Sequence, residues 1–282
     1  MQKPIIGVDL GGTKVLSARI VGDKVEAESR KLICSNAAKQ IVIDEVIANI
    51  ESVFDNDIAG IGVGVPGIVN KDGVLYDIQN IPSWDVLPLA GILKERFNVP
   101  VAINNDANCF ALGEKFFGKG QGRSDILGLI IGTGVAAGII INDKLYAGHN
   151  CGAGEFGMLP FKDHNFEYYC SGQFFENVHQ TTGLEVYEQA AVGDKAALEI
   201  LEEYGTNLGH CINAILYSID PEVIIIGGSV SKSFEFFKDA MYDQLKEFAY
   251  APVVDCLTIK VSDNPKISVL GAGALLFDKE VF

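Results

Sequence analysis

The sequence predicts an α/β protein built from two similar halves. Its 282 residues are 48% hydrophobic, enough to bury one large core or two smaller ones. Short apolar runs of strand length alternate with longer segments in which apolar residues recur at helical spacing. A shift of 120 residues lays Gly12-Thr13 on Gly132-Thr133, and it also lays Asp23-Lys24 on Asp143-Lys144. This repeat indicates duplication, and two such halves facing one another leave a cleft of the kind that binds ligands.

The positions of the individual strands and helices follow from apolar runs and from the turn residues that bound them. Apolar runs bounded by glycines or turn residues predict strands at 5–10, 15–21, 25–32, 58–65, 99–105 and 223–229. After residue 125 the chain again reads as a strand, a glycine turn and a strand. Helical spacing of apolar residues predicts one helix over 42–54 and a long one over 195–219, which Pro221 stops.

Composition excludes several classes of partner. The formal net charge of −15 and the pI near 4.6 argue against nucleic acid or an anionic membrane as the main partner. The start of the chain lacks the charged and apolar regions of a signal peptide, and its apolar runs are too short to span a bilayer. The six cysteines are scattered without a CxxC pair, which is typical of reduced thiols. We therefore expect a cytoplasmic protein.

Glycine turns form the first candidate site. In VDLGGTK (8–14), Asp9 ends a strand and is followed by Gly11, Gly12, Thr13 and Lys14. Glycines let backbone N–H groups approach a phosphate closely, Thr13 and Lys14 add donors, and Asp9 is suited to hold Mg²⁺ through water. Alternatively, these glycines serve only tight hairpins. The second turn at 132–134 and the third Gly-Gly at 227–228 together favour nucleotide binding.

Two familiar nucleotide motifs are excluded. The segment GVGVPG (62–67) fits GxGxxG and follows a predicted strand. A dinucleotide-binding motif requires a helix to open at its end, whereas IVNKDGVLYD (68–77) reads as a hairpin. The GxxxxGK[ST] pattern of P-loop proteins is absent from the sequence. Neither a dinucleotide-binding domain nor a P-loop domain is expected.

A carboxylate after the strand at 99–105 is the candidate general base. Asn104, Asn105 and Asp106 stand at the end of this strand, where a helix is predicted to begin at Asp106 or Ala107. Asp106 is suited either to cap that helix or to accept a proton from a substrate hydroxyl. Asn105 offers a donor and an acceptor, which suits a polyol. The local sequence leaves both roles of Asp106 open.

The stretch GEFGMLPFKDHNFEYYCSGQFFE (154–176) combines a histidine, a cysteine and three glutamates. These residue types are compatible with a metal site, a substrate site or a surface loop. The stretch by itself does not decide among the three.

Five segments in order resemble the ROK family, which comprises bacterial glucokinases, N-acetylhexosamine kinases, fructokinases and related sugar-sensing repressors. The resemblance rests on DLGGTK (9–14), VGVPGIV (63–69), NNDAN (104–108), GTGVAAGII (132–140) and GAGEFG (152–157). It covers essentially the whole chain and implies the actin-like/hexokinase (ribonuclease H-like) ATPase fold, with two duplicated α/β domains around a cleft. We expect these domains at 1–115 and 116–282, with the last helix packing back on the N-terminal domain.

The resemblance also implies roles for individual residues. Asp106 would deprotonate a sugar hydroxyl, commonly the 6-hydroxyl. The sugar would be bound by Asn80, Asn105, Glu155 and, from a segment whose spacing differs by about a residue, Glu176. Phosphates and Mg²⁺ would be held by Asp9, Gly11, Gly12, Thr13, Gly132, Thr133 and Gly134, and the adenosine would be bordered by Gly227 and Gly228. The expected cofactors are ATP and Mg²⁺, and the expected assembly is a homodimer.

A structural zinc ion is not expected, because this chain departs from the family pattern of one histidine and three cysteines. Met158 stands where that histidine belongs, Phe174 occupies the third cysteine position, and only Cys170 remains. One thiolate does not make a four-ligand zinc site. We expect the stretch to be a sugar-site loop held by aromatic packing of Phe161, Phe166, Tyr168, Phe174 and Phe175.

The expected function is therefore phosphorylation of a hexose or N-acetylhexosamine with ATP. Glucose, N-acetylglucosamine, N-acetylmannosamine and mannose all remain open as substrates. The alternative is a sugar-sensing regulator that binds without phosphorylating. Family repressors carry an N-terminal helix-turn-helix, for which the first predicted strand leaves no room, and the complete DLGGTK segment with Asp106 favours catalysis.

Overall fold

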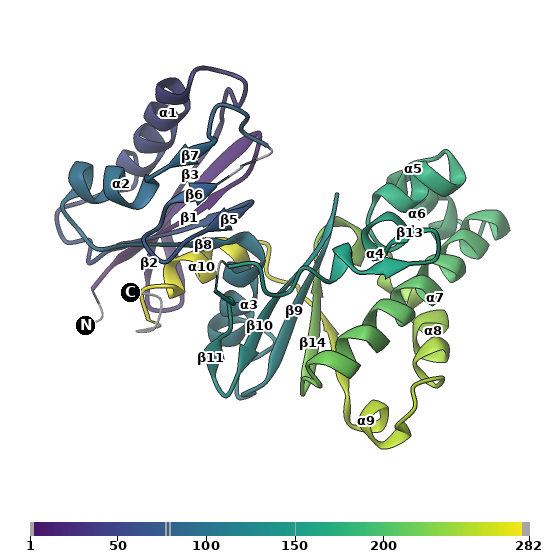
Figure 1. Cartoon of the computed structure of the whole chain (residues 1–282). Helices are drawn as coiled ribbons and strands as arrows, with labels where there is room; N and C mark the ends of the chain where they lie inside the picture. The colour runs from purple at the N-terminus through teal and green to yellow at the C-terminus, as the bar shows by residue number, and fades with distance from the viewer. Residues whose placement is uncertain (1–2, 77, 79, 150, 278–282) are drawn as a thin grey trace. The chain divides into compact units, whose positions relative to one another are not determined.

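The computed structural model describes residues 3–76, 78, 80–149 and 151–277 (Figure 1). Its α-helices are α1 (Lys39–Glu51), α2 (Leu89–Phe97), α3 (Asp106–Phe117), α4 (Phe166–Cys170), α5 (Gln173–His179), α6 (Gly183–Ala191), α7 (Lys195–Ser218), α8 (Phe234–Leu245), α9 (Ala251–Cys256) and α10 (Ile267–Ala274). Two 3₁₀ helices are η1 (Phe156–Met158) and η2 (Ser229–Ser233).

The strands fall into two five-stranded sheets and two small ones. The first large sheet contains β1 (Ile5–Leu10), β2 (Lys14–Val21), β3 (Lys24–Leu32), β4 (Ile61–Val65) and β8 (Val101–Asn105). The second contains β9 (Ile126–Ile131), β10 (Val135–Ile141), β11 (Lys144–Leu145), β14 (Val223–Gly227) and β15 (Thr258–Val261). One small sheet has the order β5 (Ile68–Val69), β6 (Leu75–Tyr76), β7 (Val86–Leu87), and the other pairs β12 (Pro160–Phe161) with β13 (His164–Asn165).

The chain divides into two compact units. The first comprises residues 1–122, 138–153 and 263–282, and the second comprises 123–137 and 154–262. Our sequence-based boundary falls after residue 115, whereas the first unit runs on to residue 122 and takes up two later segments. The last of these segments carries α10, which packs on α3 and β1 of the same unit.

The two large sheets repeat one topology. The first has the order β3-β2-β1-β4-β8 and the second the order β11-β10-β9-β14-β15. In the first, β1 is antiparallel to β2 and parallel to β4. In the second, β14 is parallel to both β9 and β15. The strand–glycine turn–strand unit of β1 and β2 thus recurs as β9 and β10, which confirms the predicted duplication.

Helices cover both faces of the first sheet (Figure 1). Side chains alternate between the faces of a strand, so β1 contributes to two apolar clusters. Ile6, Val8 and Leu10 belong to the large cluster that also takes in α1 and α2. Ile5 belongs to a second cluster, with Leu270 of α10. The strands β1, β4 and β8, which pair in parallel, are buried along their length, as parallel strands usually are, whereas the edge strand β3 is mostly exposed.

Close approach of α10 explains Gly62, the first glycine of the GxGxxG segment. A Cβ atom at Gly62 of β4 would lie 1.8 Å from the carbonyl oxygen of Ala272, and one at Gly271 would lie 1.7 Å from that of Cys109. Only glycine permits such close contact of α10 with the strand β4 and with the helix α3. After β4 the chain enters the β5–β6 hairpin rather than a helix. Exclusion of the dinucleotide-binding motif is therefore confirmed, and Gly62 serves helix–sheet packing.

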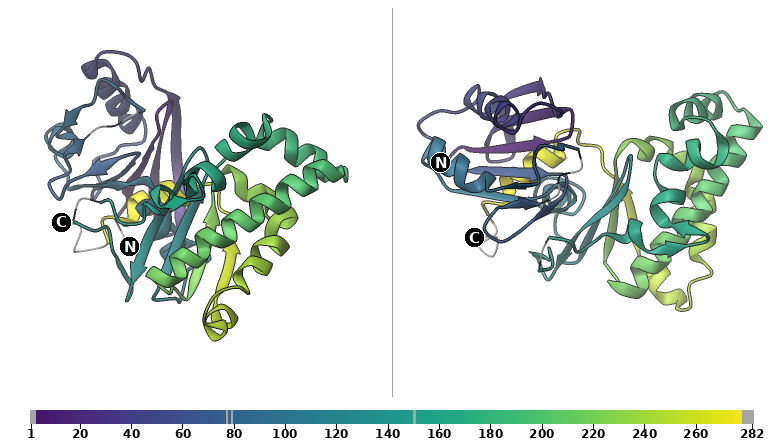
Figure 2. Two further views of the ribbon diagram at one scale, coloured as in Figure 1. Left: turned by 45° about the vertical axis from the view of Figure 1, so that its right-hand side comes forward. Right: turned by 45° about the horizontal axis from the view of Figure 1, so that its top comes forward.

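The second unit is built around the long helix α7. This helix begins after Asp194, whose side chain accepts a 2.9 Å hydrogen bond from the N–H of Ala197, and ends at Ser218, one residue before the predicted end. It runs beside α8 in both Figures 1 and 2 and contacts it closely. Its fully buried Tyr204 donates a 2.6 Å hydrogen bond to the carbonyl oxygen of Cys170. This bond ties α4 to the core of the unit.

None of the helices in the described ranges combines the length and apolar character needed to cross a bilayer. All six cysteines lie within these ranges as free thiols, as their scattered spacing predicts.

Candidate functional site

Asp9 lies near the carboxyl end of β1, at the edge where β4 and β8 also end. The parallel register places Asp9 beside Gly64 of β4, and Gly64 beside Asn104 of β8. Burial raises the pKa of the Asp9 carboxyl above its ordinary value, while Lys14 and then Arg30 lower it. A carboxylate at the carboxyl edge of parallel strands is in the usual position for a ligand or metal site in α/β proteins.

The first glycine turn brings Gly12 against Asn80. The N–H of Gly11 donates a 2.9 Å hydrogen bond to the carbonyl oxygen of Lys14, which closes the turn. A Cβ atom at Gly12 would lie 2.5 Å from the Cβ of Asn80, so no side chain fits there. Thr13 and Lys14 are exposed next to it. The turn predicted to bind phosphate and the asparagine predicted to bind sugar are therefore neighbours in this unit.

Asn105, and not Asp106, is the N-cap of α3. Its Oδ1 accepts a 2.8 Å hydrogen bond from the N–H of Ala107, and its Nδ2 donates a 3.3 Å bond to the carbonyl oxygen of Gly67. Asp106 is the first helical residue, and its own Oδ1 also lies 2.8 Å from the Ala107 nitrogen. The interpretation of Asp106 as the cap is thus corrected. Asn105 is buried, with its oxygen and one amide proton engaged inside the protein.

Asp9 and Asp106 lie around one buried thiol. Burial raises the pKa of the Cys109 thiol well above its ordinary value, and the charges of Asp106 and Asp9 raise it further. A Cβ atom at Gly64 would lie 3.0 Å from the Cys109 sulfur and 3.8 Å from the Asp106 Cα. The two carboxylates predicted to hold the metal and to act as base are therefore grouped at the same edge of the first sheet.

The second unit carries the turn Gly132-Thr133-Gly134 between β9 and β10. The N–H of Gly132 donates a 3.0 Å hydrogen bond to the carbonyl oxygen of Gly134. A Cβ atom at Gly134 would lie 2.5 Å from a carboxylate oxygen of Glu167, so a side chain there would require Glu167 to move. Thr133 is exposed at the tip. This turn has the open backbone that phosphate binding requires.

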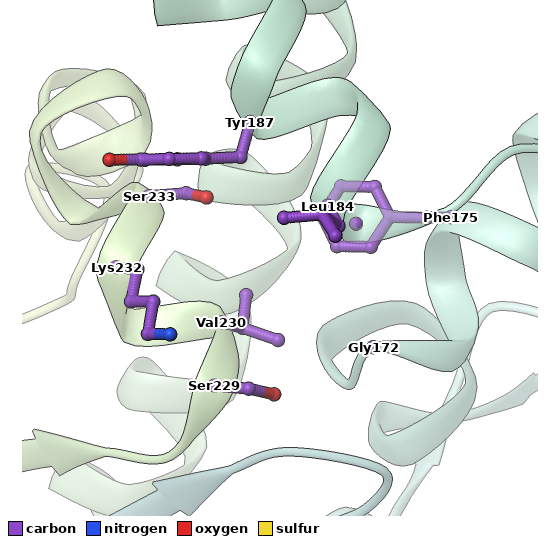
Figure 3. Close-up of a pocket in the computed structure, with 9 residues that line it drawn as sticks. Gly172, Phe175, Leu184, Tyr187, Ser229, Val230, Lys232 and Ser233 are labelled. Atoms are coloured by element: carbon purple, nitrogen blue, oxygen red, sulfur yellow. The ribbon is translucent and has the colours of Figure 1, made fainter.

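A cavity of about 310 Å³ lies in the same unit (Figure 3). Its lining comprises Gly172, Phe175, Gly183, Leu184, Tyr187, Ser229, Val230, Lys232 and Ser233. In Figure 3, Leu184 and Phe175 face the cavity from one side and Ser229 and Val230 from the other. Apolar walls with a few polar groups suit a planar base attached to a sugar.

The cavity and the glycine turn are contiguous. Gly172 lines the cavity, and its N–H donates a 2.7 Å hydrogen bond to the carbonyl oxygen of Gly132. Gly228 has φ 91°, in the left-handed region, and a Cβ atom on it would lie 2.2 Å from the carbonyl oxygen of Ile131. Gly227 ends β14 in register with Ile130 of β9. The predicted glycines thus lie next to the turn and directly before Ser229, which lines the cavity.

Sequence reasoning found these glycines but missed the cavity walls. The walls come from α5, α6 and η2, which lie far apart in the chain. Among the residues of these walls, only Ser229, which directly follows Gly227-Gly228, stands next to a motif that the sequence indicated as part of the site.

Glu155 lies close to the start of β10. The carbonyl oxygen of Gly154 accepts a 2.9 Å hydrogen bond from the N–H of Ala137, and Gly154 has φ 97°. The Glu155 side chain is exposed, yet the pKa of its carboxyl is raised, chiefly by desolvation and then by repulsion from Glu167. Glu176 lies on the exposed side of α5, where Gln173 rather than Glu176 contacts the glycine turn.

Aromatic side chains hold the segment that carries the zinc ligands elsewhere in the family. Phe161 stacks on Phe166 with ring centroids 4.6 Å apart, and Phe174 meets Phe175 edge to face at 5.3 Å. Tyr168 stacks on His164 at 4.0 Å. The predicted aromatic packing is confirmed. Met158 is 51% exposed on η1.

The residues at the first glycine turn fit a magnesium ion held through water. Mg²⁺ usually keeps several waters and is bound by one or two carboxylates together with substrate phosphates. Within the described residues, no three His, Cys, Asp or Glu side chains are grouped so as to hold a metal by themselves. Asp9 supplies one carboxylate beside a turn that is open to phosphate, which matches this mode of binding.

Two duplicated α/β sheets, each with a glycine turn between its first two strands, define the actin-like/hexokinase fold. The sequence matches the ROK family over residues 5–279, and the chain belongs to that family.

Three comparisons describe its relatives. The N-acetyl-D-glucosamine kinase of Mannheimia succiniciproducens is 29% identical, over 98% of this chain and 100% of that protein. The xylose repressor of Caldicellulosiruptor bescii is 29% identical, over 96% of this chain and 77% of that protein. The ROK family glucokinase of Streptomyces griseus, solved with glucose and AMPPNP, is 25% identical and covers 96% of this chain and 98% of its own, with a TM-score of 0.80.

Proposed function

We propose that this ROK-family sugar kinase transfers the γ-phosphoryl group of ATP to the 6-hydroxyl of a hexose or N-acetylhexosamine. The observation that carries the proposal is that Asp9 pairs with Gly64 in the sheet and that a Cβ atom at Gly64 would lie 3.8 Å from the Asp106 Cα, at the carboxyl edge of β1, β4 and β8. One carboxylate suits a general base and the other a water-held Mg²⁺. Phosphoryl transfer requires little more from a protein than such a base, a metal and correct positioning.

In this proposal Asp106 accepts the proton of the sugar hydroxyl as its oxygen attacks the γ-phosphorus. The bond to the β–γ bridging oxygen breaks, and ADP leaves with that oxygen. Asn105 fixes the backbone of Asp106 through its cap on α3 and keeps one amide proton for the sugar. Asn80, held against Gly12, would contact both the sugar and the phosphate turn. Mg²⁺, when bound, offsets the negative charge of the phosphates.

The nucleotide is assigned to the cavity and the glycine turns. The walls formed by Leu184, Phe175 and Val230 suit the adenine base, with Gly227 and Gly228 beneath the ribose. The turns at 11–13 and 132–134 are assigned to the phosphates, with backbone N–H groups other than those of Gly11 and Gly132, which already donate within their turns, as the donors. Glu155 and Glu176 are both assigned to the sugar.

The identity of the sugar depends on Met158. A thioether does not form the hydrogen bonds that histidine would form at this position. Glucose, N-acetylglucosamine, N-acetylmannosamine and mannose are the proposed substrates.

The resemblance further leads us to propose a homodimer, which analytical ultracentrifugation would test.

The test measures ADP release from ATP and Mg²⁺ with each of these four sugars and with fructose. Asp106→Asn runs alongside, with Asp44→Asn on the exposed side of α1 as the matched control. We expect turnover of Asp106→Asn to fall about 10²–10⁴-fold, as loss of a general base commonly does. Asp44→Asn should keep wild-type turnover. Melting temperature with and without sugar shows whether each variant is folded and binds.

A sugar-dependent rate that Asp106→Asn retains in full would exclude Asp106 as the base. Absence of any rate, combined with stabilisation of the protein by a sugar, would instead support a non-catalytic sugar sensor. We consider this second outcome because one of the relatives is a xylose repressor.

A further inference from the structure

Three hydrogen bonds hold the Gly132-Thr133-Gly134 turn from one side. The N–H of Gly172 donates to the carbonyl oxygen of Gly132 at 2.7 Å. The Nε2 of Gln173 donates to the carbonyl oxygen of Thr133 at 2.8 Å. A carboxylate oxygen of Glu167 accepts from the N–H of Val135 at 3.1 Å. All three partners belong to the segment 167–173, which spans most of α4 and the start of α5.

These bonds determine the direction of two backbone donors. In a trans peptide unit the C=O and the following N–H point in opposite directions. Because Gly172 holds the oxygen of Gly132, the N–H of Thr133 points away from the segment 167–173. Because Gln173 holds the oxygen of Thr133, the N–H of Gly134 does the same. Two successive N–H groups are thereby directed to one side of the turn, an arrangement suited to an anion.

We propose that Gln173 is a positioning residue for ATP, which orients the N–H of Gly134 toward the phosphates by holding the carbonyl oxygen of Thr133. This inference rests on the proposed function, in which the turn binds the phosphates of ATP. The NH₂ group of the Gln173 side chain must face Thr133, because a carbonyl oxygen accepts hydrogen bonds and does not donate them.

Gln173 suits this role because its hydrogen bond is the one that holds the carbonyl oxygen of Thr133 and so the Thr133–Gly134 peptide. Glycine residues on both sides of Thr133 permit rotation of the peptide plane, since no Cβ atom restricts φ and ψ. Thr133 is exposed at the tip, and Gln173 is half-buried at the start of α5. Loss of its hydrogen bond would let the Thr133–Gly134 peptide rotate and turn the donor away from the anion.

The test compares Gln173→Met with Asn177→Leu. Each change replaces an amide by an apolar side chain of similar size on α5, but Asn177 lies on its exposed side. We measure the KM for ATP, the KM for the sugar, and the melting temperature with and without AMPPNP. For Gln173→Met we expect the KM for ATP to rise about tenfold, the effect of one lost hydrogen bond of ordinary strength. The KM for the sugar and the melting temperature without ligand should match those of Asn177→Leu.

An unchanged KM for ATP in Gln173→Met would overturn the proposal while leaving the sugar kinase function intact. A parallel loss of ATP affinity, sugar affinity and melting temperature would also overturn it, because Gln173 would then serve only general stability. If the wild-type protein neither phosphorylates a sugar nor is stabilised by AMPPNP, the proposed function itself fails. The three results are distinguishable within one set of measurements.

Discussion

The Oδ1 atom of Asn105 lies 2.8 Å from the backbone nitrogen of Ala107 and caps α3 one residue before Asp106. The cap holds the first turn of the helix, and with it the backbone that carries the proposed base. The Nδ2 of Asn105 also reaches the carbonyl oxygen of Gly67, so one side chain links the helix to the loop after β4.

Replacement of Asn105 by alanine should therefore lower both stability and activity. We expect the free energy of unfolding to fall by about 1 kcal/mol, the usual cost of losing an N-cap, as measured by urea unfolding. Turnover should fall with it, because Asp106 loses its fixed position. Asp194→Ala removes the N-cap of α7 and is the matched control. Asp194→Ala should lower the free energy of unfolding by a similar amount and leave turnover unchanged. Equal losses of turnover in the two variants would argue against the positioning role of Asn105.

Replacement of Asp9 by asparagine should stabilise the ligand-free protein and impair catalysis. Burial raises the pKa of Asp9, so the folded protein binds its proton more tightly than the unfolded chain does. The contribution of Asp9 to stability is therefore lost as the pH rises from the ordinary carboxyl pKa of about 3.9 through the raised value. Melting temperatures should show a stabilisation by Asp9→Asn at pH 7 that shrinks as the pH falls toward 4. Turnover should drop about 100-fold or more, since metal stabilisation supplies several kcal/mol.

Asp23→Asn is the control for that experiment, because Asp23 is exposed in the turn between β2 and β3. It should change neither the melting temperature nor the turnover. A lower melting temperature of Asp9→Asn at pH 7 would show that the attraction of Lys14 and Arg30 outweighs the burial of the carboxylate.

An aspartate at Leu184 should weaken nucleotide binding without affecting the sugar. Leu184 lines the cavity from α6, and a charge there would face the base in place of an apolar side chain. We expect the KM for ATP to rise about tenfold, which corresponds to the loss of one partly buried apolar contact. Val192→Asp places the same charge just beyond α6, at a residue 85% exposed, and should leave the KM for ATP unchanged. A normal KM for ATP in Leu184→Asp would place the base elsewhere.

Much of the fold was readable from local patterns. The strands β1, β2 and β3, the strand–turn–strand unit of β9 and β10, and the helix α7 all lie within a few residues of their predicted bounds. These elements are specified by apolar periodicity and by glycine or proline at their ends, which act over a few residues. The two glycine turns were found in the same way, because a strand that ends in glycines is a local feature.

Features that depend on the folded backbone, or that join distant segments, escaped prediction. The cap of α3 by Asn105 depends on the backbone angles at the end of β8, and residue type alone favours asparagine and aspartate equally. The walls of the cavity and the contact of Gln173 with Thr133 join residues 40 or more positions apart.

The sequence by itself determined the elements, the duplicated halves, the glycine turns and the family, because each depends on residue order over short spans or on ordered motifs. Only the tertiary structure decided which face of each turn is held, which residues form the cavity and why Gly62 must lack a side chain. These depend on packing between segments that the chain brings together only when it folds. Gly62 is the clearest case, because its motif suggests a nucleotide whereas the carbonyl oxygen of Ala272, 1.8 Å from where a Cβ would lie, explains it.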